Sequence, residues 1–113
     1  MLPKRFVRRT GFLDEAIMPF YVVLANWTEE GVRTVKQAPA RGEALRRSVE
    51  AAGGKVLSML HTMGGYDAVV SVELPSDQVA NELMLRAGMQ GFVRTTTLKG
   101  WSPAEFSALV EKL

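Results

Sequence analysis

Two apolar runs separated by a glycine-rich turn dominate the hydrophobic pattern of the chain. Residues 55–74 read KVLSMLHTMGGYDAVVSVEL, in which stretches rich in Val, Leu and Met flank Met63 to Asp67. Gly-Gly tolerates the positive φ angles that a short hairpin demands, so this stretch predicts a strand, a tight turn and a returning strand. Both strands are too apolar for a solvated edge, and we therefore expect the hairpin in the middle of a sheet.

Two further strands are predicted, one on each side of the hairpin in the sequence. Residues 20–27 (FYVVLANW) are β-branched and aromatic, and they are apolar on both faces. Residues 91–100 (GFVRTTTLKG) include three consecutive threonines. The polarity of this last strand suits an edge or a half-exposed position.

Helical spacing and capping residues predict a short helical turn and a longer helix between the first strand and the hairpin. Thr28 is the expected cap of a short helical turn that runs to Val35. Pro39 opens a longer helix that continues to about Ala52, and Gly53-Gly54 ends it. One side of this helix is apolar and the other is expected to face water. The apolar side comprises Ala44, Leu45, Val49 and Ala52, and the polar side comprises Arg41, Arg46, Arg47 and Glu50.

Two more helices are predicted in the second half of the chain. Ser76 is the expected cap of a helix that stops near Gly88. Ser102 and Glu105 have the spacing of a capping box, with Pro103 at the first helical position. The apolar residues of the first helix are Val79, Ala80, Leu83, Met84 and Ala87, and those of the C-terminal helix are Phe106, Leu109, Val110 and Leu113.

The order β-α-β-β-α-β plus a terminal helix is that of a ferredoxin-like α+β fold. In this fold both crossover helices lie on one side of a four-stranded antiparallel sheet. Two helices cover only one face of the sheet, yet the strands are apolar on both. In the first strand Phe20, Val22 and Leu24 oppose Tyr21, Val23, Ala25 and Trp27, and in the second Val56 and Leu60 oppose Leu57, Met59 and Met63.

The second apolar face therefore needs a cover, and the same face of another copy is the simplest one. Burying its large side chains gains on the order of 10–15 kcal/mol per chain. Gained from both subunits, this exceeds the ~4–15 kcal/mol cost of association. We predict a two-fold homodimer with the sheets face to face, closing into a dimeric α+β barrel. In the alternative, the C-terminal helix folds over the open face of its own chain.

The charge of the chain divides it into an extension and a domain. The 113 residues suffice for one domain and carry a net charge of +2 without any cysteine. Residues 1–17 hold four basic and two acidic side chains, which leaves ten of each sign in residues 18–113. We expect residues 1–17 to be a flexible basic extension, with an arm that binds a partner chain as the alternative.

Composition and hydropathy also narrow the partners and the location. The neutral domain lacks the basic stripe of a nucleic-acid-binding protein. No apolar run approaches the ~20 residues that cross a bilayer, and no signal-peptide core follows the N-terminal charges. We therefore expect a cytoplasmic protein that binds neither nucleic acid nor membrane.

The hairpin carries a family resemblance. Residues 62–70 (TMGGYDAVV) resemble the motif of the GYD-domain family, in which Gly-Tyr-Asp begins the third strand. Residues 18–24, 26–28 and 93–97 agree with the family pattern, so that the resemblance covers residues 18 to about 111. It implies a ferredoxin-like, dimeric α+β fold and a family without an assigned activity. Related folds include ligand-sensing domains and cofactor-independent monooxygenases, and this is fold analogy alone.

The candidate catalytic residues are His61, Asp67 and Asn26. His61 is the sole histidine. Facing the sheet interior, it would serve as a general base or a haem ligand, with a histidine hydrogen-bonded within the core or the interface as the alternative. Asp67 either orients a base or ligand or accepts backbone N–H groups and locks the hairpin. No metal-ligand cluster, nucleophile motif or phosphate-binding loop is found, and we predict neither a metal nor a cofactor.

The candidate ligand-binding residues are Trp27, Tyr66 and Arg94. Trp27 would line a pocket, and Tyr66 would pack with its hydroxyl wet or bonded to a neighbouring chain. Arg94 would pair with Asp67 or with an anionic ligand.

The sequence is compatible with three functions, and only one of them is enzymatic. The first is a homodimeric regulatory module that binds a small apolar or anionic molecule between the sheet and the helices. The second is a small oxygenase or isomerase that uses Asn26, His61 and Asp67. In the third, the basic arm docks on a partner.

Overall fold

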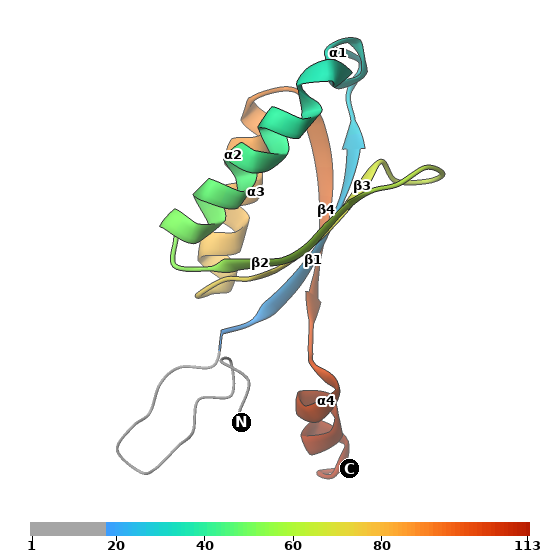
Figure 1. Ribbon diagram of the computed structural model, residues 1–113. Coiled ribbons are helices and arrows are strands. Elements are labelled where there is room, and N and C mark those ends of the chain that lie inside the picture. Colours follow the sequence, from blue (N-terminus) through green and yellow to red (C-terminus); the bar gives the residue numbers. More distant parts are fainter. Residues whose placement is uncertain (1–17) are drawn as a thin grey trace.

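The computed structural model describes residues 18–113, and they fold into one antiparallel sheet with helices. The predicted flexible extension, residues 1–17, lies outside the described residues. The elements in chain order are β1 (Phe20–Trp27), α1 (Glu29–Arg33), a 3₁₀ turn (Val35–Gln37), α2 (Ala38–Ala51), β2 (Lys55–His61), β3 (Ala68–Glu73), α3 (Asp77–Met89), β4 (Val93–Gly100) and α4 (Pro103–Val110) (Figure 1).

The sheet has the strand order β2-β3-β1-β4, with antiparallel pairing throughout. Val23 lies opposite Val70 in the β1–β3 pair, and Leu24 lies opposite Thr96 in the β1–β4 pair. Helices α2 and α3 lie on the same side of the sheet (Figure 1). This arrangement confirms the predicted ferredoxin-like βαββαβ fold with an added C-terminal helix, and it places β4 at an edge as its threonines indicated.

The hairpin is not in the middle of the sheet as a unit. β3 is central, whereas β2 forms the outer edge because β1 inserts between β3 and β4. A covered face explains two of the apolar residues of β2, since Val56 is buried and Met59 packs against the core, whereas Leu57 and Leu60 are exposed. The apolar residues of β2 therefore indicate that helices cover one face of the strand. They do not indicate that β2 has a neighbouring strand on each side.

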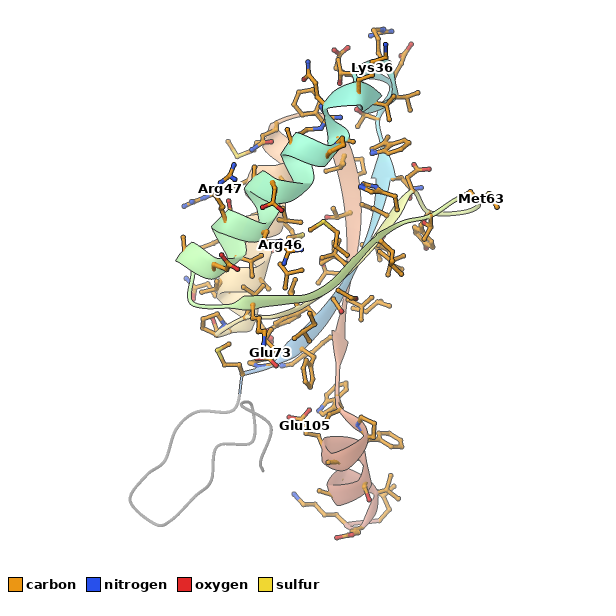
Figure 2. The ribbon with its side chains drawn as sticks, in the orientation of Figure 1. Lys36, Arg46, Arg47, Met63, Glu73 and Glu105 are labelled. Atoms are coloured by element: carbon orange, nitrogen blue, oxygen red, sulfur yellow. The ribbon has the colours of Figure 1, made fainter. Side chains whose placement is uncertain are left out.

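The connection between β2 and β3 is wider than the predicted tight turn. His61 ends β2 and Ala68 begins β3, so residues 62–67 form the loop. Gly64 has a φ of 107°, but Gly65 has no positive φ. The loop carries Met63 at its outer tip, where this side chain is 97% exposed (Figure 2).

An irregularity in β2 changes which of its residues share a face. The pairing with β3 shifts between Val56 and Ser58. As a result Val56 and Met59 lie opposite Val72 and Val70, under the helices, whereas Leu60 lies opposite Val69. The predicted grouping of Val56 with Leu60 is therefore wrong, because one extra residue reverses the alternation of the strand.

The core lies between the sheet and the two crossover helices. Its buried residues are Tyr21, Val23, Val49, Val56, Val70, Val72, Leu74 and Ala80. The alternate residues of β1 and β3 are only partly buried, which identifies the opposite face as the open one. No element of residues 18–113 covers that face.

Helix α4 lies apart from the core. The predicted capping box is present: the Ser102 hydroxyl accepts from the Glu105 N–H, and the Glu105 carboxylate accepts from the Ser102 N–H. None of its residues is buried, and it extends beyond the end of β4 (Figure 1). The alternative in which this helix covers the open face of its own chain is therefore wrong.

Candidate functional site

A cavity of about 450 Å³ lies between α2, α3 and the covered face of the sheet. Small side chains create it, because Ala25, Gly42, Ala68 and Ala87 line positions where larger residues would fill the space. A Cβ atom at Gly42 would lie only 3.2 Å from the Met59 sulfur. The apolar wall comprises Val23, Leu45, Ala52, Met59, Val70, Val79, Leu83, Met84 and Val93.

Arg41 supplies a fixed positive charge to this cavity. Its guanidinium carbon lies 4.3 Å from the centre of the Phe92 ring, within the range of a cation–π contact. The Nη2 group donates to the carbonyls of Gly31 (3.4 Å) and Thr34 (3.3 Å), and Nη1 donates to the Thr34 hydroxyl (3.3 Å). These contacts hold the half-buried guanidinium in one orientation.

His61 and Trp27 form another part of the cavity wall. They come from the ends of β2 and β1, and their ring centres lie 6.3 Å apart with the planes inclined by 36°. The imidazole is exposed and reaches the cavity from the sheet edge. The candidates His61 and Trp27 therefore come together, although they lie far apart in the sequence.

Asp67 and Asn26 join the hairpin loop to β1 instead of lining the cavity. The Asp67 carboxylate accepts from the Trp27 N–H at 2.9 Å, and the Asp67 N–H donates to the Ala25 carbonyl at 2.8 Å. The Asn26 side-chain amide donates to the Gly65 carbonyl at 2.9 Å. Of the two readings left open for Asp67, its contacts match the one in which it locks the hairpin.

Tyr66 and Arg94 do not line the cavity. Tyr66 is 40% exposed in the hairpin loop, and Arg94 is opposite Asn26 in the β1–β4 pair, on the open face. The ion pairs within residues 18–113 involve Arg33, Arg46 and Lys99. The expected pair of Arg94 with Asp67 is not among them, because the Asp67 carboxylate turns toward the Trp27 backbone.

A second polar cluster joins β1, β4 and the first turn of α3. The Tyr21 hydroxyl donates to Asp77, and Lys99 Nζ lies 3.1 Å from the same carboxylate. The hydrogen bond from Tyr21, followed by that from Lys99, lowers the pKa of Asp77. Burial, reinforced by the Asp77 carboxylate, raises the pKa of Tyr21. The three groups satisfy one another, which is the pattern of a structural contact.

The sequence reasoning missed Arg41 by assigning it to the water-facing side of α2. Arg41 lies four residues before Leu45 and eight before Val49, so helical spacing places it on the apolar stripe. That spacing was the available signal. Arg47, by contrast, is exposed and points away from the sheet, as predicted (Figure 2).

Residues 18–113 contain neither a cluster of metal-ligating side chains nor a helix that could span a membrane. No group of three or more His, Cys, Asp or Glu side chains is arranged to hold a metal ion. No helix in that range is both long and apolar enough to span a bilayer.

Comparison with known proteins places this geometry in context. The family model of the GYD domain matches residues 21–110. A protein from Thermus thermophilus called "Glutamine synthetase and cystathionine beta-lyase binding protein" is 29% identical over 92 residues, which cover 80% of this chain and 97% of that protein. The solved structure of the leucine response regulatory protein LrpA from Mycobacterium tuberculosis matches with a TM-score of 0.49 and 17% identity. That match covers 74% of this chain and 51% of LrpA, so the chain spans about half of that structure's length.

Proposed function

Since the chain belongs to the GYD-domain family, we propose that it is a module that binds a small molecule and regulates a partner protein. We place this module in the cytoplasm and propose that it is a homodimer. The functional domain is residues 18–113, with residues 1–17 as an extension. The name of the Thermus thermophilus relative, a binding protein for two enzymes, supports the regulatory part. This binding and regulatory role needs no catalytic activity.

The observation that carries the proposal is the cavity between α2, α3 and the sheet. Its volume of about 450 Å³ lies within the range of ~300–1,000 Å³ that is usual for small-molecule sites. Its wall is mostly apolar, with a few polar groups at fixed positions, which is the usual composition of such sites.

The test is to fill the cavity and quantify the small molecules that leave with the protein. Ala87 lines the cavity from α3, and Ala87→Leu adds bulk there. Ala40→Leu is the matched control, because Ala40 is exposed on α2 and does not line the cavity. Small molecules released from the denatured, purified proteins are measured by mass spectrometry. We expect a compound that accompanies the wild type and the control but not Ala87→Leu; an unchanged yield in all three contradicts the proposal.

The open face of the sheet supports the homodimer. Leu60 is 62% exposed and Leu98 is 49% exposed, on strands at opposite edges of this face. Val22 and Leu24 lie between them on β1 and are only partly buried. Large apolar patches of this kind on an isolated chain are typical of association surfaces. Light scattering at several concentrations tests it, and a concentration-independent monomer would exclude the dimer.

A second candidate function is a small oxygenase or isomerase, and the observation that favours it is His61 in the cavity wall. The same geometry argues against a complete catalytic pair, because the Asp67 carboxylate is engaged by the Trp27 N–H. If the compound that co-purifies is turned over, His61→Ala separates the two roles. An enzyme that uses His61 as its base loses turnover, whereas a binding module keeps its affinity.

A further inference from the structure

The charged side chains around the cavity include more basic groups than acidic ones. Arg41 and Arg86 are basic, Glu82 is acidic, and residues 18–113 as a whole carry ten charges of each sign. Glu82 and Arg86 lie one turn apart on α3, so their charges offset one another. Arg41 is therefore the source of a local positive excess in a domain whose net charge is zero.

The groups that contact the guanidinium of Arg41 are uncharged, so its positive charge has no counter-charge among them. Its guanidinium contacts two carbonyl oxygens, one hydroxyl and the Phe92 ring, and the ion pairs within residues 18–113 do not include it. A guanidinium has five N–H donors, and carboxylates form its strongest hydrogen bonds. Because its orientation is already held, an anion would bind it without a further ordering cost.

We infer that the cavity binds an organic monocarboxylate, with its apolar body among the Val, Leu and Met side chains and its carboxylate at Arg41. One guanidinium balances one negative charge, whereas a phosphate dianion would leave a net charge in an apolar cavity. This inference rests on the proposed function, since it names the class of molecule for the same cavity. Arg41 is the residue that confers the selectivity for an acid over its uncharged analogue.

The experiment compares two compounds of the same shape and different charge. Binding of 4-phenylbutyrate and of 4-phenylbutanamide to the full chain is measured by calorimetry. We expect the wild type to prefer the acid by at least about tenfold, the gain of a charge-assisted hydrogen bond over a neutral one. Arg41→Gln is expected to abolish this preference and to leave amide binding within about threefold, whereas Arg41→Lys retains part of the preference.

Arg47→Gln is the matched control, because it removes the same charge from the exposed side of the same helix. It should leave the preference for the acid intact, which excludes an effect of net charge. Since Arg41 also bonds the segment around Thr34, thermal unfolding is measured for each variant, and binding is compared below the transition.

Three results would overturn the inference. They are equal binding of acid and amide by the wild type, an undiminished preference in Arg41→Gln, and no binding of either compound at millimolar concentration. Equal binding would leave the cavity as a small-molecule site, so the proposed function would stand. The proposed function fails separately, if Ala87→Leu and Ala40→Leu release the same small molecules as the wild type.

Discussion

Asp67 holds the hairpin loop against β1 through both its carboxylate and its backbone N–H. Together with the Asn26 to Gly65 bond, these contacts fix the point at which the loop enters β3. Two residues of the Gly-Tyr-Asp signature, Gly65 and Asp67, thus attach the loop to β1. Sequence reasoning identified Asp67 as special but left two roles open, since the partner of a carboxylate depends on tertiary geometry that no local pattern encodes.

Replacing Asp67 by Ala should destabilise the fold. The Trp27 N–H would lose its acceptor at a half-buried position, which costs about 1–3 kcal/mol. Urea denaturation measures the change in the free energy of unfolding. Asp67→Asn keeps one carbonyl oxygen and should lose less, and equal stability of Asp67→Ala and the wild type would contradict the role.

The Tyr21–Asp77–Lys99 cluster predicts a dependence of stability on acid. The pKa of Asp77 is lower in the folded chain than its ordinary value of 3.8, so the folded state binds fewer protons. The resulting stabilisation is present above pH 3.8 and is lost as the pH falls through the lower folded pKa. Thermal unfolding from pH 7 to pH 2 should show a smaller loss for Asp77→Asn and for Tyr21→Phe, and parallel curves for all three proteins would count against the cluster.

At the scale of elements, local signals located the helix ends well. Thr28, Ser76 and Ser102 all cap helices as predicted, and Gly53 takes a positive φ at the end of α2. A cap depends on contacts within a few residues, so the sequence contains it. The irregularity in β2 escaped prediction because it is defined by the pairing with β3, and pairing is not local.

Gly31 illustrates how one element limits another. A Cβ atom at this position would lie 2.1 Å from the Phe92 carbonyl oxygen, so α1 can approach the start of β4 only with glycine there. We expect Gly31→Ala to cost roughly 1–3 kcal/mol of unfolding free energy, as overpacking does. The substitution should also weaken acid binding, because the Gly31 carbonyl accepts from Arg41.

Gly88→Ala is the control for that change. Gly88 lies within α3, and a Cβ atom there would meet nothing within 4 Å. Alanine is a better helix former than glycine by about 0.5–1 kcal/mol, so this variant should be more stable than the wild type. Thermal unfolding of the two variants beside the wild type should shift in opposite directions, and a shared direction would refute the packing argument.

At the scale of the molecule, the fold class followed from the order of elements, but the position of each strand did not. The sequence correctly showed more apolar surface than two helices on one face can cover. It did not show whether α4 would return to the sheet, because an amphipathic stripe specifies that a helix needs a partner and not which one. The cavity was foreseen only as a region between sheet and helices, since small residues such as Ala25 and Ala87 reveal empty space only after packing is known.

Helix α4 should contribute to self-association. Phe106 is 57% exposed and Leu109 is 42% exposed on the apolar side of a helix that has no buried residue. The double variant Phe106→Asp, Leu109→Asp should raise the dissociation constant of the proposed dimer at least about tenfold, given about 1.5–3 kcal/mol for each large side chain removed from an interface. Analytical ultracentrifugation measures this constant.

Ala108→Asp provides the control on the opposite side of the same helix, and it should leave association unchanged. Both proteins should keep the stability of the core, because α4 has no buried residue. Equal dissociation constants for the double variant and the control would remove α4 from the interface.

The short connection between β4 and α4 has a consequence for how copies assemble. Only Trp101 and Ser102 separate the strand from the helix, so the reach of α4 is set by a link of about 7 Å at full extension. If two copies exchange their helices reciprocally, the symmetry closes and growth stops at a pair. If each helix docks on the next copy in one direction, the copies form a ring where the rotation closes and a filament where it does not. The short link limits the positions that α4 can reach on a neighbouring copy, and the symmetry of the contact at those positions decides between a closed particle and a polymer.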